Sequence, residues 1–269
     1  MTAVLQARST ESPVLLSHEI HGSHGPLVLM LHGLGSRGED WGFQIEALQD
    51  RYRVLTLDLR GHGISPSAPG WPTLRDLAAD VASLLQQIGE QRAHIVGLSL
   101  GGGVALQMSI DFPGQVESLT IVNAAATLRV PFRRFPSAFM RLALLLTGHR
   151  RRLGKRVAVG LFPRADQLQL REVTAERIAE NTRINYLKAI LAILRFDLRK
   201  EVHLIEVPTL VVAGRLDPTV PLRSKVALAQ AVPGARLEVI ENSGHATPLD
   251  APDEFNRILL EFISEPTAR

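Results

Sequence analysis

The sequence predicts an α/β protein with a mostly parallel sheet of eight or seven strands, helices on both faces and an inserted helical segment. Short apolar runs typical of strands alternate with amphipathic helical stretches, and this alternation is interrupted once, between residues 126 and 200. The length of 269 residues is enough for one large core that buries roughly three-quarters of the unfolded surface. We therefore expect one discontinuous core, residues 1–125 and 201–269, and one helical insertion, residues 126–200.

Seven short runs have the composition of strands. Several of them are continuously apolar, as expected for parallel strands that are covered on both faces. The runs are residues 15–20, 27–31, 54–57, 94–96, 119–122, 210–213 and 237–240. We expect the first two to be neighbours in the sheet, because only a glycine-rich turn separates them.

One core helix is indicated by several signals over residues 74–88. Its apolar residues recur at helical spacing, Thr73 and Asp76 form a start that resembles a capping box, and Gly89 stands where a C-terminal glycine belongs. Strand signals disappear in the insertion. Three amphipathic helices are expected there, over residues 136–146, 175–186 and 187–196.

Composition excludes several kinds of chemistry. The chain has no cysteine, so disulfides, a thiolate nucleophile, thiolate zinc sites and iron–sulfur clusters are ruled out, and any nucleophile must be an oxygen or a nitrogen. Residues 1–12 lack the apolar stretch of a secretory signal, and no apolar run approaches the roughly 20 residues that span a bilayer. We therefore expect a cytoplasmic protein without integral membrane association.

Charge is distributed unevenly along the chain. Residues 126–200 hold 17 Lys and Arg against 5 Asp and Glu, a balance of +12, which leaves −9 for the remainder and +3 in total. Such asymmetry favours an acidic partner, an anionic substrate or a lipid headgroup surface, unless the insertion is simply a basic layer on an acidic core. Through residues 150–156 we expect at most weak binding to anionic surfaces, and we expect no nucleic-acid partner.

The strand-like run at residues 94–96 leads into Gly97-Leu98-Ser99-Leu100-Gly101 and then into an apolar helix. A bare G-x-S-x-G pattern arises by chance in about one chain in ten of this length, so the strand before it and the helix after it are what make it significant. A sharp turn between strand and helix forces the serine into a strained conformation and raises its hydroxyl above the sheet. Glycines two residues to either side avoid collisions where the strand and the helix cross, and the helix N-terminus favours an anion.

With its other motifs, this sequence resembles the α/β-hydrolase superfamily over most of its length, in particular the serine esterase and haloperoxidase-like branch with a helical cap. Residues 32–35 (His-Gly-Leu-Gly) resemble the oxyanion loop, residues 58–65 the D-x-R-G-x-G-x-S turn, residues 214–217 (Gly-Arg-Leu-Asp) the acid-bearing turn and residues 242–246 (Asn-Ser-Gly-His-Ala) the C-terminal S-G-H loop. Serine, aspartate and histidine follow one another in the order of this fold.

The resemblance implies a catalytic triad of Ser99, Asp217 and His245. A serine hydroxyl is a weak nucleophile at neutral pH, so a histidine must take its proton, and a carboxylate behind the imidazole fixes the tautomer. The backbone N–H groups of Leu34 and Leu100 are expected to form the oxyanion hole. The insertion is expected to be a lid over the nucleophile.

Other polar residues in these motifs are expected to have structural roles. Asp58 and Asp250 are interpreted as turn or cap residues, and His32 and His62 as braces between loops. Some members of this superfamily carry the acid after the strand that corresponds to residues 119–122. Asn123 or an alanine occupies that place here, which favours Asp217 as the acid of the triad. An apolar lining of the lid is expected from Phe132, Phe135, Phe139, Met140, Leu142, Leu145, Leu146, Leu161 and Phe162.

The leading hypothesis is a serine hydrolase that cleaves a carboxylic ester, either a short acyl ester or a lactone, through an acyl-enzyme on Ser99. The same triad would serve a carbon–carbon bond hydrolase or a cofactor-free perhydrolase with haloperoxidase-like activity. A hypothesis of another class is a small-molecule receptor that retains a hydrolase pocket. Dehalogenases and epoxide hydrolases of this superfamily attack with aspartate, so the serine argues against both.

No cofactor and no metal are implied by the sequence. The glycine cluster lacks the Lys-Ser/Thr of a phosphate-binding loop, and metal-ligand spacing such as H-E-x-x-H is absent. The expected partner is a small ester or lactone substrate, and the protein is expected to be a monomer or a homodimer.

Overall fold

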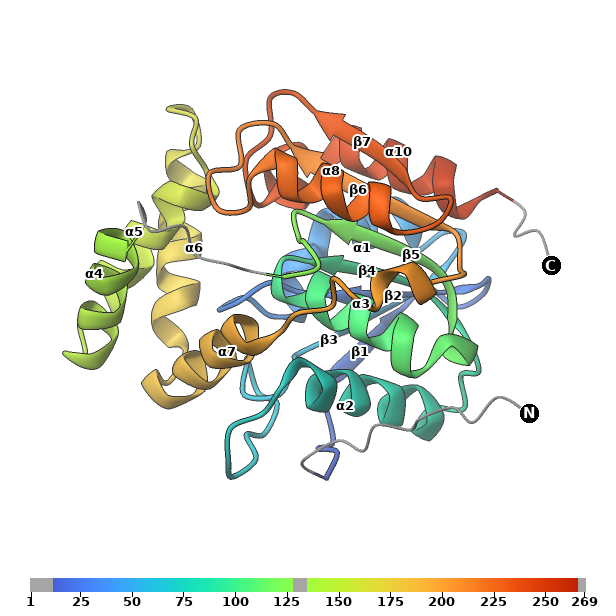
Figure 1. Cartoon of the computed structure of the whole chain (residues 1–269), viewed down its shortest axis with the longest axis horizontal. Helices are drawn as coiled ribbons and strands as arrows, with labels where there is room; N and C mark the ends of the chain where they lie inside the picture. Colours follow the sequence, from blue (N-terminus) through green and yellow to red (C-terminus); the bar gives the residue numbers. More distant parts are fainter. Residues whose placement is uncertain (1–11, 128–134, 266–269) are drawn as a thin grey trace.

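The computed structural model describes residues 12–127 and 135–265, and in this part of the chain seven strands form one sheet (Figure 1). In chain order they are β1 (His18–His21), β2 (Leu27–Leu31), β3 (Arg53–Leu57), β4 (Ala93–Leu98), β5 (Val116–Val122), β6 (Thr209–Gly214) and β7 (Arg236–Ile240). The order across the sheet is β1-β3-β2-β4-β5-β6-β7. Only β1 is antiparallel to its neighbour. The predicted α/β class with a mostly parallel sheet is therefore confirmed.

The first two strands are not neighbours, so that prediction was wrong. Val54 of β3 is paired with His21 of β1 on one side and with Val28 of β2 on the other. The turn between β1 and β2 passes over the segment before β3, where a Cβ at Gly25 would collide with the Arg51 carbonyl oxygen. A short glycine-rich connection therefore joins strands that are separated by a third.

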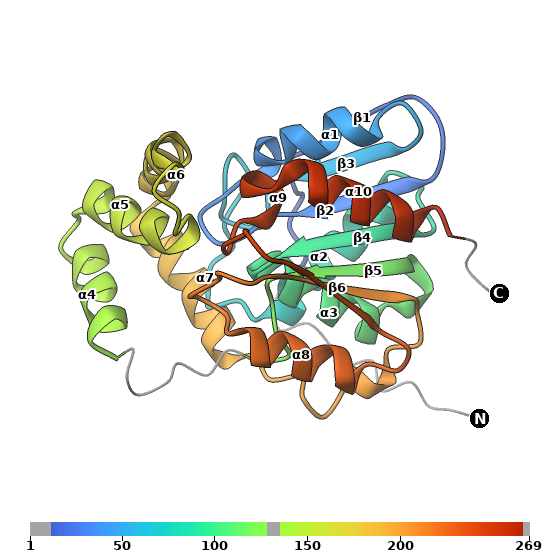
Figure 2. The ribbon, with the colours of Figure 1, turned by 90° about the horizontal axis from the view of Figure 1, so that it is seen from above.

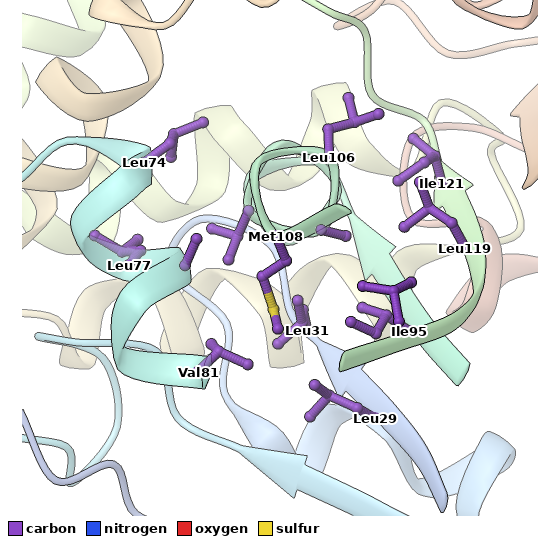
Figure 3. Packing of buried hydrophobic residues seen from close by; sticks show 14 of the residues in the cluster. Leu29, Leu31, Leu74, Leu77, Val81, Ile95, Leu106, Met108, Leu119 and Ile121 are labelled. Carbon is purple, nitrogen blue, oxygen red and sulfur yellow. The ribbon is translucent and has the colours of Figure 1, made fainter. Parts of the chain in front are cut away.

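Apolar side chains alternate between the two faces of the sheet. Along β2, Leu29 points into one core cluster and Met30 into the other. The first cluster packs against α2 (Leu74–Gln87), α3 (Leu100–Asp111) and α8 (Leu222–Ala231), and Figure 3 shows α2 and α3 facing the strands there. The second packs against α1 (Gly42–Leu48) and α10 (Pro252–Ile263) on the opposite face (Figure 2). The sheet is thus covered on both sides.

In the described residues between β5 and β6, four α-helices lie beside the sheet rather than on its faces (Figures 1 and 2). These insertion helices are α4 (Phe135–Leu146), α5 (Arg150–Leu161), α6 (Leu168–Glu180) and α7 (Arg183–Arg195). The other helical segments of residues 12–127 and 135–265 are the short α9 (Thr247–Asp250) and the 3₁₀ segments Gly38–Trp41, Pro113–Gln115 and Val202–Leu204. The division of the chain into a core and a cap domain stays a prediction.

The sequence located α4 and α7 better than α5 and α6. A single helix over residues 175–186 was predicted, but α6 ends at Glu180 and α7 starts at Arg183, with Thr182 as its N-cap. The extended backbone of Asn181 allows its side-chain amide to donate to the Gly35 carbonyl oxygen at 3.0 Å. That contact with the core interrupts the helix, and no local pattern encodes it.

The basic face of α5 is exposed. All five Lys and Arg side chains of residues 150–156 are exposed, whereas Leu153 and Gly154 are buried. Over residues 12–127 and 135–265, no helix has both the length and the apolar composition to cross a bilayer. Weak binding to anionic surfaces stays a prediction.

The start of α2 provides a test of the predicted cap. Thr73 Oγ1 accepts from the Asp76 N–H at 3.3 Å, and Asp76 Oδ2 accepts from the Thr73 N–H at 2.7 Å. Replacing Thr73 by Ala removes one of these bonds and is expected to lower the free energy of unfolding by about 1 kcal/mol. Urea denaturation would measure this. The exposed Gln86→Ala on the same helix is the control, and equal stabilities of the two variants would contradict the prediction.

Candidate active site

Ser99 lies between the end of β4 and the start of α3, in a conformation that few residues adopt. Its φ of 54° and ψ of −107° are strained for a side chain larger than glycine. Two backbone hydrogen bonds hold it there, from its own N–H to Val122 O at 2.9 Å and from Gly103 N–H to its carbonyl at 3.1 Å. This is the turn that the sequence predicts.

The glycines around Ser99 allow the strand and the helix to cross closely. A Cβ at Gly97 would collide with the Gly101 carbonyl oxygen, and a Cβ at Gly101 would collide with the Leu31 carbonyl oxygen. Any side chain at either position would push α3 away from the sheet. The sequence predicts that glycines two residues to either side of Ser99 are required by the close packing of strand and helix, and the positions of Gly97 and Gly101 agree with this.

The structure brings the three predicted triad residues together. Nε2 of His245 lies 2.9 Å from Oγ of Ser99, and Nδ1 of His245 lies 2.9 Å from Oδ2 of Asp217. His245 is 4% exposed and Asp217 is 7% exposed. With the carboxylate ionised, Nδ1–H donates to Asp217, and Nε2 is left to accept from the serine hydroxyl. This arrangement allows His245 to remove the proton of Ser99 during attack.

The Asp217 carboxylate is held in its ionised form. Burial alone would raise the pKa of Asp217, but the charge and hydrogen bond of His245, together with those of Lys225, outweigh burial and lower this pKa to about 2. Oδ1 also accepts from the backbone N–H groups of Thr219 at 2.7 Å and Val220 at 3.2 Å. The carboxylate is therefore fixed in orientation and charged at neutral pH.

The loop that carries His245 is anchored on two sides. Asp250 accepts from Ser243 Oγ at 2.7 Å through Oδ1 and from the Gly244 N–H at 2.6 Å through Oδ2. On the side of the insertion, the His245 N–H donates to the carbonyl oxygen of Leu161 at the end of α5, at 3.0 Å. Asp250 thus stabilises the loop, in line with its predicted structural role.

Asn123 occupies the end of β5, where no carboxylate is present. It is fully buried with a φ of 47°, and its amide nitrogen donates to the carbonyl oxygen of His245 at 2.8 Å. Its amide oxygen accepts from the Gly214 N–H at 2.8 Å and from Lys225 Nζ at 2.6 Å. Asn123 therefore connects the turn before Asp217 with the histidine loop.

The two predicted oxyanion-hole residues border the same cavity as Ser99 and His245. Leu100 is the first residue of α3, so its N–H has no acceptor within the helix. A Cβ at Gly33, the residue before Leu34, would lie 3.7 Å from the Ser99 Cβ, so this loop passes close to the nucleophile. The role of both N–H groups stays a prediction.

His32 holds the loop of residues 32–35 in place. Its Nε2 accepts from the Leu59 N–H at 2.9 Å and its Nδ1 donates to the Gly33 carbonyl oxygen at 2.8 Å. Burial, reinforced by the neighbouring His62, lowers the pKa of His32 to about 3, so the ring stays neutral. Asp58 accepts from the N–H groups of Gly38 and Ile64. These residues brace loops, as the sequence predicts.

A cavity of about 1270 Å³ opens from Ser99 and His245 between the core and the insertion helices. Its walls are mostly aliphatic. Leu142, Leu161 and Phe162 line it as predicted, whereas Met140, Leu145 and Leu146 do not. Leu145 instead packs inside the insertion, and Leu146 is exposed. Phe132 and the side chains of Phe135 and Phe139 lie outside the described residues. Sequence reasoning missed the lining from α7, which consists of Leu187, Ile190, Leu191, Ile193 and Leu194.

Sequence reasoning also missed Lys225, which lies 2.8 Å from Asp217 Oδ2. One signal was available, because Lys225 and Leu228 are three residues apart and share the buried face of α8. A lysine in such a core-facing position needs a partner. Among residues 12–127 and 135–265, no three His, Asp or Glu side chains cluster in a way that could hold a metal ion.

Residues 26–252 match the family model described as alpha/beta hydrolase fold, and the chain therefore belongs to the alpha/beta hydrolase family and is a hydrolase. It is 32% identical to "Putative carbamate hydrolase RutD" of Azorhizobium caulinodans, over 93% of this chain and 95% of the relative.

Two solved structures show the same fold over nearly their whole length. The enol-lactonase from Burkholderia xenovorans LB400 has a TM-score of 0.86 and 28% identity, over 93% of this chain and 96% of that chain. The bromoperoxidase from Bacillus anthracis has a TM-score of 0.86 and 25% identity, over 95% of this chain and 97% of that chain. Both likenesses agree with the family that the sequence resembles.

The low pKa of Asp217 predicts a dependence of stability on pH. A carboxyl with a folded-state pKa of about 2, against an ordinary 3.8, stabilises the fold above about pH 4, and this contribution is lost as the pH falls toward 2. Asp217→Asn is therefore expected to be less stable than the wild type at pH 7, with a gap that narrows below pH 4. Urea denaturation from pH 7 to pH 3 measures the gap.

The control for this experiment is Asp253→Asn, which changes an exposed carboxyl in the first turn of α10. A gap between wild type and Asp217→Asn that stays constant down to pH 3 would contradict the assignment of a strongly stabilised carboxylate.

Proposed function

We propose that this protein is a serine hydrolase that cleaves a carboxylic ester or lactone through an acyl-enzyme on Ser99. The observation that carries the proposal is the line of two 2.9 Å contacts from Asp217 through His245 to Ser99, which opens into a large apolar cavity. The hydrolase fold and the likeness to an enol-lactonase support it, because a lactone is a cyclic ester.

In this mechanism Ser99 Oγ attacks the ester carbonyl carbon while His245 Nε2 takes the hydroxyl proton. The N–H groups of Leu34 and Leu100 would stabilise the oxyanion of the tetrahedral intermediate. When the intermediate collapses, His245 returns the proton to the leaving alkoxide, and the carbon–oxygen bond breaks. A water molecule, deprotonated by the same imidazole, then hydrolyses the acyl-enzyme and releases the acid.

The lid hypothesis gains support from the position of the insertion helices. Side chains of α4, α5, α6 and α7 all border the cavity that contains Ser99. The cavity exceeds the roughly 300–1,000 Å³ of ordinary small-molecule pockets. We infer that it accepts a bulky apolar acyl or alkyl group and has room for more than a short acyl chain.

Carbamate hydrolysis is the second candidate, favoured by the name of the relatives that are 32% identical over 93% of this chain. It would use the same nucleophile on a carbonyl bonded to nitrogen. The aliphatic walls favour esters with large apolar groups over a small charged carbamate. Perhydrolase, haloperoxidase-like and carbon–carbon bond hydrolase activities use the same triad and need separate substrate assays.

The nucleophile is tested with a fluorophosphonate probe and with Ser99→Ala. The wild type should be labelled and should hydrolyse p-nitrophenyl esters, and the variant should lose labelling and several orders of magnitude in kcat while it stays folded. Ser83→Ala, on α2 and away from the cavity, is the control and should behave as the wild type. Ester turnover that survives in Ser99→Ala would refute the proposed function.

The size of the cavity is tested with p-nitrophenyl esters of two to twelve carbons and with an aryl carbamate. We expect kcat/KM to increase with chain length in the wild type, because each added methylene is removed from water. Leu191→Trp narrows the cavity and should shift the optimum to shorter chains. Ile184→Trp, on an exposed position of the same helix, should leave the profile unchanged. A preference for the carbamate would favour the second candidate.

A further inference from the structure

A lysine is buried directly behind the candidate triad. The Lys225 side chain is fully buried, and Nζ lies 2.8 Å from Asp217 Oδ2, 2.6 Å from Asn123 Oδ1 and 3.2 Å from the Gly214 carbonyl oxygen. An ammonium group has three N–H donors, and the three acceptors match them. A buried charge without such partners would cost several kcal/mol. The site is therefore built to hold a protonated lysine.

Lys225 and the imidazole of His245 share one oxygen of Asp217. Oδ2 lies 2.9 Å from His245 Nδ1 and 2.8 Å from Lys225 Nζ, while Oδ1 accepts two backbone N–H groups. Four donors thus occupy the carboxylate, which leaves it no freedom to rotate away from the imidazole. The ammonium group of Lys225 also neutralises part of the negative charge that Asp217 presents to the imidazole of His245.

A cation at this distance opposes the protonation of the resting histidine. Imidazolium next to a carboxylate is stabilised, and a second positive charge on the same oxygen reduces that stabilisation. The base then stays neutral, and able to accept the serine proton, to a lower pH. Burial lowers the pKa of Lys225 and outweighs the charge and hydrogen bond of Asp217, which raise it, so the ammonium depends on the carboxylate to keep its proton.

We propose that Lys225 is a positioning residue that fixes Asp217 Oδ2 and extends the working range of His245 to lower pH. This inference rests on the proposed function, because it assigns a positioning residue to that same site. Its chemistry is electrostatic, so no bond to Lys225 forms or breaks during turnover.

Few other charged groups face the pair. Ser99 meets the imidazole from the turn between β4 and α3. Asp250 of α9 bonds to Ser243 and Gly244 of the loop that carries His245 rather than to the ring. Five more ionisable side chains border the cavity: Arg141, Arg177, its partner Asp40, Tyr186 and the exposed Arg223. Among the described residues, the cation in direct contact with Asp217 besides the imidazole is Lys225.

The test measures the rate of fluorophosphonate labelling against pH, which needs no knowledge of the natural substrate. In Lys225→Met, a neutral side chain of similar length, the acid limb of the profile should move upward by on the order of one pH unit. Lys200→Met removes the same charge at an exposed position and should leave the limb unchanged. Circular dichroism checks that each variant is folded.

Restoring the charge separates electrostatics from packing. The chain has no cysteine, so Lys225→Cys provides a single thiol that can be alkylated in the unfolded protein before refolding. Aminoethylation restores an ammonium at nearly the length of lysine, and carbamidomethylation gives a neutral side chain. The aminoethylated protein should recover the wild-type acid limb, and the carbamidomethylated protein should not.

The outcomes distinguish the two claims. Absence of labelling in the wild type would defeat the proposed function, whereas labelling of the wild type with an unshifted acid limb in Lys225→Met would overturn only the role of Lys225. A limb that moves downward, or a rate that falls equally at every pH, would overturn it as well. If Lys225→Met does not fold, the two alkylated forms of Lys225→Cys decide, and equal acid limbs for both would overturn the proposal.

Discussion

The close crossing of β4 and α3 is the constraint on which the site depends. Gly97 and Gly101 allow the backbones to approach until a methyl group would not fit, and Ser99 is held between them at positive φ. Ser99 directly precedes the first residue of α3, so it lies at the N-terminus of this helix, and both Ser99 and Leu100 border the cavity. The cost of the strain is met by the packing of α3 in the largest apolar cluster, where Leu106 and Met108 are fully buried (Figure 3).

A second layer of buried polar contacts places the remaining triad residues. Asn123 uses both ends of its amide, the nitrogen toward the histidine loop and the oxygen toward Gly214 and Lys225. The ends of β5 and β6 and the loop after β7 are thereby connected. Because an unpaired buried amide or ammonium would destabilise the protein, these groups support one another. Removing one of them costs the others a hydrogen bond, although each keeps further partners.

Features encoded by neighbouring residues were predictable from the sequence, and features that need distant partners were not. The cap at Thr73 and the turn at Ser99 follow from short patterns, and Asp217 and His245 stand in short motifs that resemble those of the hydrolase family. The insertion of β3 between β1 and β2 depends on pairing between segments about 30 residues apart. Helix α5 was not predicted, and its contact with α6 uses Gly154, a poor helix former, at a place where a Cβ would collide with the Ala175 carbonyl oxygen. The role of Lys225 became visible only when Asp217 and Asn123 were placed beside it.

The insertion helices contact the loops that carry His245 and Leu34, which links the shape of the cavity to the geometry of the candidate site. Leu161 O accepts from the His245 N–H, and Asn181 donates to the Gly35 carbonyl oxygen beside Leu34. Arg177 pairs with Asp40, which joins α6 to the segment that follows the same loop. A displacement of α5 would therefore be transmitted to His245 through one backbone hydrogen bond, and a displacement of α6 to the Leu34 loop. The walls of the cavity and the loops that carry His245 and Leu34 therefore share these bonds, so a change in the packing of the insertion helices also changes the support of the candidate site.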